Sequence, residues 1–317
     1  MTKPTSGSRD DTKREFEDAI LSAYYRGRAA SDRESQEVDG LIRRRGQFEK
    51  LAGADPELFI LHRCANIAAS WLSFIAAGIV EEFADEENEG QPLDEQVAGL
   101  AFFSRLANDL WAIIELVEIG FDLQARALTR GFLEHVDVLI CCTLDREVTT
   151  EFVGAIEPDA ANQFWHRHVS KNKAKAKVST FIAGELGRQS ITIVDLLRED
   201  AELAASELLH PTVTAGLSTA FGHPDGEYES YGIFPLPLAA SVGVFRSILI
   251  HLLWLSFAMG GQPRYASWEW LPLFQTERLK RNEEIERFGS LYRRMFGFLL
   301  DHQLLMHPDD DGHQTED

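Results

Sequence analysis

Three long apolar segments follow one another between residues 55 and 143, and only short breaks separate them. Asp55 followed by Pro56 is a typical start signal for a helix. "GQP" at 90–92 ends the first segment, and Gly120 ends the second. Long helices joined by short breaks are typical of a helical bundle, and no run shows the period-two alternation of a strand. We therefore predict an all-α bundle of long antiparallel helices without a sheet, whose core helices cover 55–89, 93–119, 121–143 and 238–260.

Shorter helical patterns surround this core. Residues 11–27 and 33–52 predict an N-terminal helical pair within 11–53, followed by a main bundle at 54–306. Residues 217–237 form one long irregular segment, and the polar ends at 1–10 and 307–317 are predicted to be disordered. The remaining helices are expected at 146–156, 159–171, 175–187, 192–209 and 274–305.

The charge balance constrains the partners. The 317 residues carry a net charge of −20, which disfavours nucleic acid because both molecules are acidic. Two basic clusters, 41–50 and 166–177, are predicted to be solvated surface. The three cysteines, Cys64, Cys141 and Cys142, sit in apolar helical context and are expected to be small buried side chains.

A cytoplasmic location without a membrane anchor is expected. The first sixteen residues are polar and lack the apolar core of a signal peptide. Residues 238–261 are long enough to span a bilayer, but Arg246 and His251 lie near the centre of this segment, where charge is costly. We therefore predict a buried core helix there, which can be apolar on all sides.

The predicted helix 121–143 contains an unusual number of ionisable groups. Arg126, Arg130, Glu134 and Asp137 fall within an arc of about 80° when residues advance by 100° each, and apolar side chains fill most of the remainder. One hypothesis is an ordinary solvent face with an Arg130–Glu134 pair one turn apart. The other is that the charged stripe faces an enclosed polar cleft, to which His210 at the end of "SELLH" contributes.

The same segment resembles a family of helical prokaryotic proteins catalogued as a domain of unknown function. The similarity covers roughly residues 100–220 and rests on Gly120, Ala125, Arg126, Leu128, Arg130 and Glu134, and on Ser206 with His210. It implies a helical fold with a polar centre and no particular reaction. In this hypothesis Arg130, Glu134 and His210 form the candidate catalytic set, and Arg126 and Ser206 are ligand-binding residues.

A second similarity is to the HEPN superfamily of helical ribonucleases. "RGFLEH" has the Arg-x4-His form of that superfamily, with Arg130 and His135. The resemblance implies metal-independent RNA cleavage at a dimer interface. The two side chains point about 140° apart on the helix, and the acidic net charge speaks against RNA.

A metal site is the third alternative. Glu207 and His210 form one Glu-x-x-His motif, and Glu115 and Glu134 are possible further carboxylates. Carboxylate-bridged di-metal bundles use two such motifs, and the chain has no second one, so no metal or other cofactor is expected.

The function classes therefore stay open between a module and an enzyme. We predict a helical module that binds a small molecule or a protein partner, or that associates with itself through apolar surface containing Trp254, Trp268 and Trp270. The alternatives are the ribonuclease or toxin-type enzyme, with His210 as the proton carrier, and the metal-binding bundle.

Overall fold

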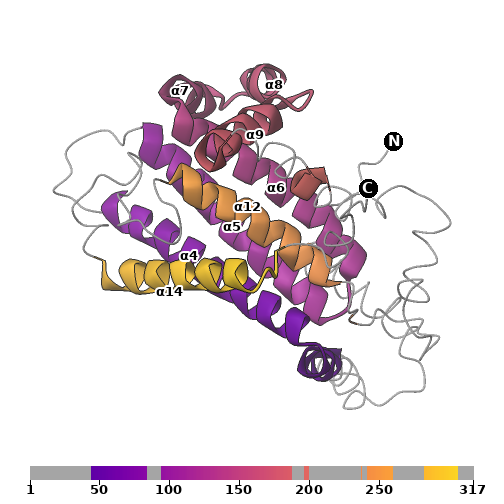
Figure 1. Ribbon diagram of the computed structural model, residues 1–317. Helices are drawn as coiled ribbons and strands as arrows, with labels where there is room; N and C mark the ends of the chain where they lie inside the picture. The colour runs from indigo at the N-terminus through magenta and orange to yellow at the C-terminus, as the bar shows by residue number, and fades with distance from the viewer. Residues whose placement is uncertain are drawn as a thin grey trace, which may run out of the picture.

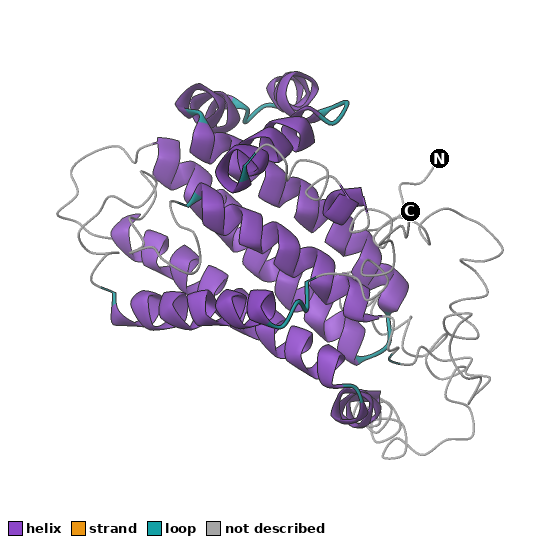
Figure 2. Cartoon of the chain, viewed as in Figure 1, coloured by secondary structure: helices purple, strands orange, loops and turns teal. Residues whose placement is uncertain are grey.

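The computed structural model describes residues 44–83, 94–187, 196–199, 237, 241–259 and 282–305. Nearly all of them are helical, and none of these described residues belongs to a strand (Figures 1 and 2). The predicted all-α fold is therefore confirmed. Most of the predicted N-terminal pair, both tails and the segment 217–236 lie outside the described residues.

Four long helices form the centre of the fold. Helices α4 (Pro56–Phe83), α5 (Asp94–Glu118) and α6 (Asp122–Leu144) follow one another, and α12 (Val242–Ala258) packs against both α6 and α4 (Figure 1). Each of the four thus contacts two others and contributes to one hydrophobic core. These are the helices that the apolar segments predict for the core.

The directions of the helices follow from contacts between their ends. His62 of α4 contacts Glu118 of α5, and Ser73 contacts Trp111, so these two helices run antiparallel. Ser241, at the start of α12, bonds to Asp122 at the start of α6, and Arg246 bonds to Glu57 at the start of α4. The alternation expected for all four core helices therefore holds for α4, α5 and α6, whereas α12 runs parallel to α4 and α6.

Local signals fix the helix ends as the sequence indicates. The Asp55 carboxylate accepts hydrogen bonds from the backbone N–H groups of Glu57 and Leu58, at 3.0 and 3.1 Å, which caps α4. Gly120 adopts a φ of 85° after α5, a conformation that glycine tolerates best. Asn282 caps the last helix, α14 (Glu283–Asp301), through its side-chain oxygen.

Helix α14 closes the bundle over α4. The Tyr292 ring stacks on Trp71 with centroids 4.1 Å apart, and its hydroxyl donates to the Leu252 carbonyl at 3.1 Å. Gly289 lies directly beside Trp71, and a Cβ atom at this position would come within 3.3 Å of the indole nitrogen. This contact is tighter than most Cβ contacts, because the two helices approach closely here.

A small helical lobe covers one end of the bundle (Figure 1). It consists of α7 (Arg146–Gly154), α8 (Pro158–Phe164), the π-helical turn η2 (Trp165–Val169) and α9 (Lys173–Leu186). The sequence predicts one α-helix over 159–171, but the structure changes to π-helix at Trp165. Lys171 and Asn172 then adopt positive φ values and turn the chain into α9.

Among the residues that the structure describes, two helices are long and apolar enough to cross a membrane, namely α4 and α5. The segment 238–261, which the sequence shows to be long enough for a span, contains the shorter helix α12, of 17 residues. Just over half of each candidate window is buried inside the bundle, as expected for core helices. The cytoplasmic location stays a prediction.

Candidate functional site

The charged stripe of α6 divides between the core and the surface. Arg126 is buried, and its Nε donates to the Asp122 carboxylate at 2.6 Å. The other oxygen of Asp122 accepts from the Ser241 hydroxyl at 2.8 Å. This buried group ties the first turn of α6 to the start of α12, and it satisfies charges that would otherwise be costly to bury.

Asp137 forms the second buried contact of the stripe. Both of its oxygens accept hydrogen bonds from Arg198, at 2.5 and 3.1 Å. The Arg198 side chain is fully buried, and its guanidinium lies over the Trp254 ring at 4.6 Å. Trp254 is thus a core residue, and its predicted place in an exposed association surface is wrong.

His251 packs beside this ion pair. Its ring lies 4.4 Å from the ring of Trp254, and its Nδ1 bonds to the Ser247 carbonyl at 3.0 Å. Burial lowers the pKa of His251 well below its ordinary value, and the nearby positive charges of Arg198 and Lys175 lower it further. The neutral imidazole is therefore the form that the core accommodates.

The other half of the stripe faces solvent. The Arg130 and Glu134 side chains are 56% and 59% exposed, and their closest charged atoms are 3.9 Å apart. The prediction that these two residues lie in an enclosed cleft is therefore wrong. His135 is half-buried, and its Nδ1 contacts the Gly131 carbonyl at 2.6 Å. Because a carbonyl oxygen only accepts, Nδ1 is the donor in this contact. A catalytic role for these residues stays a prediction.

The remaining predicted site residues, Ser206, Glu207 and His210, lie outside the described residues. Glu115, a possible metal ligand, is exposed and forms an ion pair with Arg45. Within the described part of the chain, no three His, Cys, Asp or Glu side chains are grouped so that they could hold a metal ion.

The three cysteines are free and buried, as the sequence indicates. Burial raises the pKa of Cys141 to about 11 and the pKa values of Cys64 and Cys142 to about 12. The thiolate is the reactive form of cysteine, so none of these side chains is suited to nucleophilic chemistry.

An uncharged surface follows the seam between α4 and α5. The Trp111 indole is 38% exposed, and its N–H donates to the Ser73 hydroxyl at 3.1 Å. Neighbouring positions at helical spacing are small or uncharged and at least partly exposed. We call the following set the α4–α5 face: Ser70, Ser73, Ala77, Val80, Ser104, Asn108, Trp111 and Ala112.

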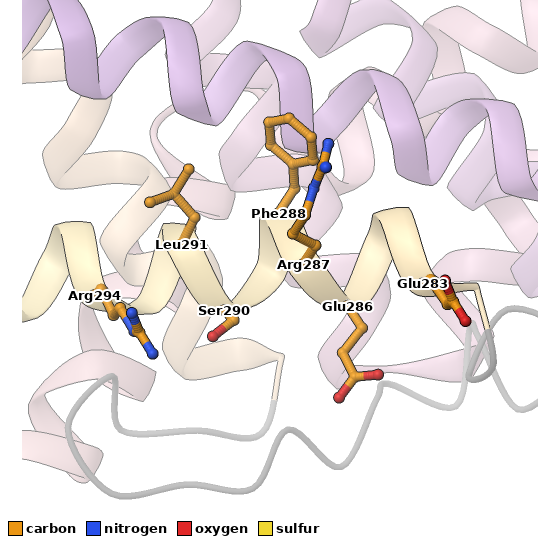
Figure 3. Close-up of a pocket in the computed structure, with 7 residues that line it drawn as sticks. All are labelled: Glu283, Glu286, Arg287, Phe288, Ser290, Leu291 and Arg294. Atoms are coloured by element: carbon orange, nitrogen blue, oxygen red, sulfur yellow. The ribbon is translucent and has the colours of Figure 1, made fainter.

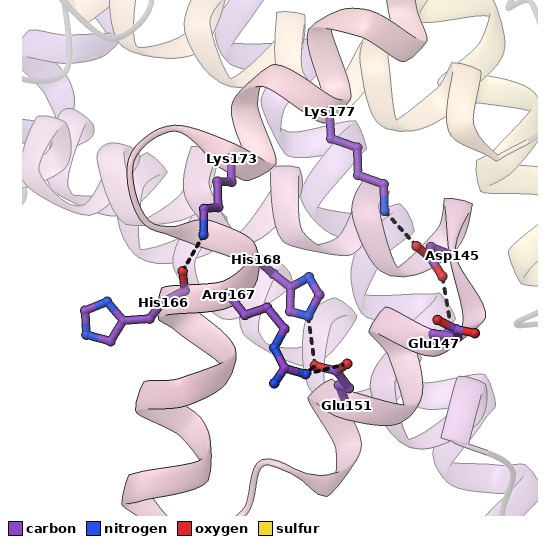
Figure 4. Close-up of polar contacts among 8 residues, drawn as sticks. All are labelled: Asp145, Glu147, Glu151, His166, Arg167, His168, Lys173 and Lys177. Atoms are coloured by element: carbon purple, nitrogen blue, oxygen red, sulfur yellow. Dashed lines mark hydrogen bonds and ion pairs between the residues drawn. The ribbon is translucent and has the colours of Figure 1, made fainter.

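The lobe carries a basic surface of different character (Figure 4). Arg167 donates to both oxygens of Glu151 at 2.9 Å, and His168 contacts the same carboxylate. These contacts, led by His168, lower the pKa of Glu151. Lys177 binds Asp145 at 3.0 Å, which lowers the pKa of that carboxyl. The Arg167–Glu151 ion pair joins η2 to α7, and the Lys177–Asp145 ion pair joins α9 to the residue before α7.

A shallow pocket of about 660 Å³ lies along the exposed side of α14 (Figure 3). Two glutamates and two arginines contribute to its lining, together with two apolar side chains and one serine. The formal charges of these residues cancel, so the pocket has no dominant charge. Its lining residues are Glu283, Glu286, Arg287, Phe288, Ser290, Leu291 and Arg294.

The buried polar contacts use residues that the sequence does not single out. Arg198 contacts Asp137 from 61 residues further along the chain, and Ser241 contacts Asp122, the partner of Arg126, from 119 residues further along. The only available signal is the need of each buried charge for a partner, which does not identify that partner. No family model matches the chain, and neither a curated protein nor a solved structure is significantly similar to it.

Proposed function

We propose that this protein is a self-associating helical module and that two copies meet through the α4–α5 face. The observation that carries the proposal is an exposed surface without charge on a chain with a net charge of −20. A cytoplasmic location is part of the same proposal, in which a dimer covers this uncharged surface from water.

The absence of charge on the α4–α5 face is not explained by burial alone. Residues 64–80 of α4 contain no Asp, Glu, Lys or Arg, although 26% of the chain is charged. The buried positions of this stretch must be apolar. Ala77 and Val80 are exposed, however, and Ser70 and Ser73 are partly exposed. Solvent-facing helix positions ordinarily carry polar or charged side chains, whereas the centres of protein interfaces are depleted of charge.

The surroundings of the face support the same proposal. Trp111 is exposed on this face beside Ser73, and tryptophan is prominent among residues that dominate binding energy. Charged residues, including Arg63, Arg105 and Glu115, are exposed at its borders. A centre of small side chains with one aromatic residue and a charged border is the usual arrangement of an interface.

A second copy is the partner that the charge favours. Two chains of net charge −20 repel each other over most orientations. A symmetric dimer joins the same patch from each copy, so the neutral face is where this repulsion is smallest. Its alanine and serine side chains also allow helices to approach to the usual 8–10 Å or so.

The proposal is tested by sedimentation equilibrium of the full chain and of three variants. Wild type should have twice the 35.7 kDa chain mass at micromolar concentration. Trp111→Ala should weaken the dimer, and Ala77→Glu should abolish it because two like charges would face each other across the symmetry axis. Ala127→Glu adds the same charge at an exposed position of α6 and should leave the dimer intact.

Two results would overturn self-association. One is a wild-type chain that stays monomeric across the micromolar range. The other is recovery of the chain only from membranes with detergent, which would assign the α4–α5 face to lipid. Circular dichroism of each variant establishes that a change in mass does not come from unfolding.

A further inference from the structure

We propose that residues 165–177 form a docking surface for a short acidic segment of a partner protein. This surface, which we call the basic turn, comprises η2, the residues 170–172 and the first part of α9. The inference does not depend on self-association, because the basic turn lies on the lobe and the α4–α5 face lies on the bundle.

The charge of the basic turn is opposite to that of the whole chain. It contains Arg167, Lys171, Lys173, Lys175 and Lys177 and no acidic residue, whereas the chain has 51 acidic and 31 basic residues. The sequence alone favours a solvated surface for such a cluster. In the structure, two of its cations are already neutralised, by Glu151 and Asp145. The remaining lysines determine what the surface can bind.

Lys171 and Lys173 are exposed and have no ion pair within the described part of the chain. The Lys173 ammonium donates to the His166 carbonyl at 2.8 Å, a neutral acceptor that leaves its positive charge unbalanced (Figure 4). Lys173 also lies in the first turn of α9, where no acidic residue is present and where the helix dipole disfavours a cation. The fold therefore gains little from this charge, and an added carboxylate would be stabilised there.

An exposed aromatic side chain lies next to these cations. Trp165 is 45% exposed, and its ring meets the ring of His166 edge to face at 5.0 Å. The Lys173 ammonium bonds to the backbone of the same His166. An apolar contact and a positive charge are thus adjacent, which suits a segment that combines carboxylates with an apolar side chain.

The limited extent of the basic turn favours a short peptide over nucleic acid. Glu151 and Asp145 border it directly, and Glu147 follows on α7 (Figure 4). A nucleic acid strand carries a phosphate about every 3.4 Å and would continue beyond the basic turn over acidic surface. The charges of a peptide can be confined to a few residues. At physiological ionic strength, screening over about 8 Å reduces repulsion from the more distant acidic residues.

Fluorescence anisotropy with the full chain tests this inference. The probe is a fluorescein-labelled peptide of six glutamates and two leucines, capped at both ends. Lys171→Ala with Lys173→Ala should weaken binding roughly 2- to 30-fold, the effect of losing two exposed ion pairs. Trp165→Ala should weaken it as well. Lys50→Ala, which removes an exposed cation from the described helical residues 44–54, is the control and should bind as wild type does.

The same titration can also contradict the proposed docking of an acidic peptide. No measurable binding by wild type, or equal binding by the double variant, would overturn it. Tighter binding of an eight-nucleotide single strand than of the peptide, lost in Trp165→Ala, would assign the surface to nucleic acid instead. Repeating the titration with the Ala77→Glu chain separates this result from self-association, because peptide binding should not change in that variant.

Discussion

Asp137 and Arg198, which lie 61 residues apart in the sequence, form a bidentate ion pair inside the protein. The guanidinium is fully buried and rests on Trp254. Arg198 belongs to a described helical stretch of four residues, 196–199. The pair therefore anchors this stretch to α6.

Removing one partner of this pair should be strongly destabilising. Asp137→Ala leaves the Arg198 charge buried without its partner, so we expect a loss of about 3–5 kcal/mol in the free energy of unfolding. Glu134→Ala, on the same helix but exposed, should cost about 0–1 kcal/mol. Urea denaturation followed by circular dichroism measures both. Equal losses of stability in the two variants would contradict the conclusion that Asp137 is buried and paired whereas Glu134 is exposed.

A double substitution separates charge from packing at the same place. Asp137→Leu with Arg198→Met replaces both ionic groups by apolar side chains. Because buried pairs are often replaced in this way at little cost, the double variant should be more stable than Asp137→Ala. If the double variant is instead less stable than Asp137→Ala, apolar side chains cannot take the place of the ion pair in this part of the core.

Two glycines of α14 should respond in opposite directions to alanine. Gly289→Ala places a Cβ 3.3 Å from the Trp71 indole, so α14 must shift and we expect a loss of about 1–3 kcal/mol. Gly297 has no atom within 4 Å of its Cβ position. Gly297→Ala should therefore stabilise the helix by about 0.5–1 kcal/mol. Thermal unfolding shows whether each variant is more or less stable than wild type. A stabilising Gly289→Ala would show that α14 and α4 do not approach this closely.

The stability should fall in acid because of His251. Its folded-state pKa is depressed, so the unfolded chain binds the proton more readily at pH values below 6.5. The contribution of neutral His251 to stability is complete above that pH. Below it, about 1.4 kcal/mol of the free energy of unfolding is lost for each pH unit until the folded-state pKa is reached. His251→Gln should remove this part of the pH dependence. Denaturation curves between pH 7.5 and about 5 compare the two slopes, and identical slopes would refute the role of His251.

The thiols should be unreactive in the folded protein. Burial raises the pKa values of all three to about 11 or 12, so neither exposure nor thiolate formation favours reaction at pH 8. Titration with a chromogenic disulfide reagent should detect no thiol in the native state and all three in guanidinium. Rapid reaction of one thiol in native protein would identify a region that opens locally.

The sequence by itself determined the helices and much of the core. Helix ends depend on neighbouring residues, such as the Asp55 cap and the positive φ of Gly120. Helical periodicity predicted the apolar segments that became α4, α5, α6 and α12. It also indicated that Arg246 and His251 belong to a buried helix, in which both are now found.

Only the tertiary structure decided which charges of α6 are buried. Arg126 and Asp137 are enclosed and Arg130 and Glu134 are exposed, although all four lie within about 80° on the helix. Asp137 is paired with Arg198, and Arg126 is paired with Asp122, which also accepts from Ser241, so the buried charges have partners from distant parts of the chain. Periodicity describes one helix at a time. It shows where a charge points along that helix, and it does not show which later segment supplies a partner, because that depends on how the helices pack.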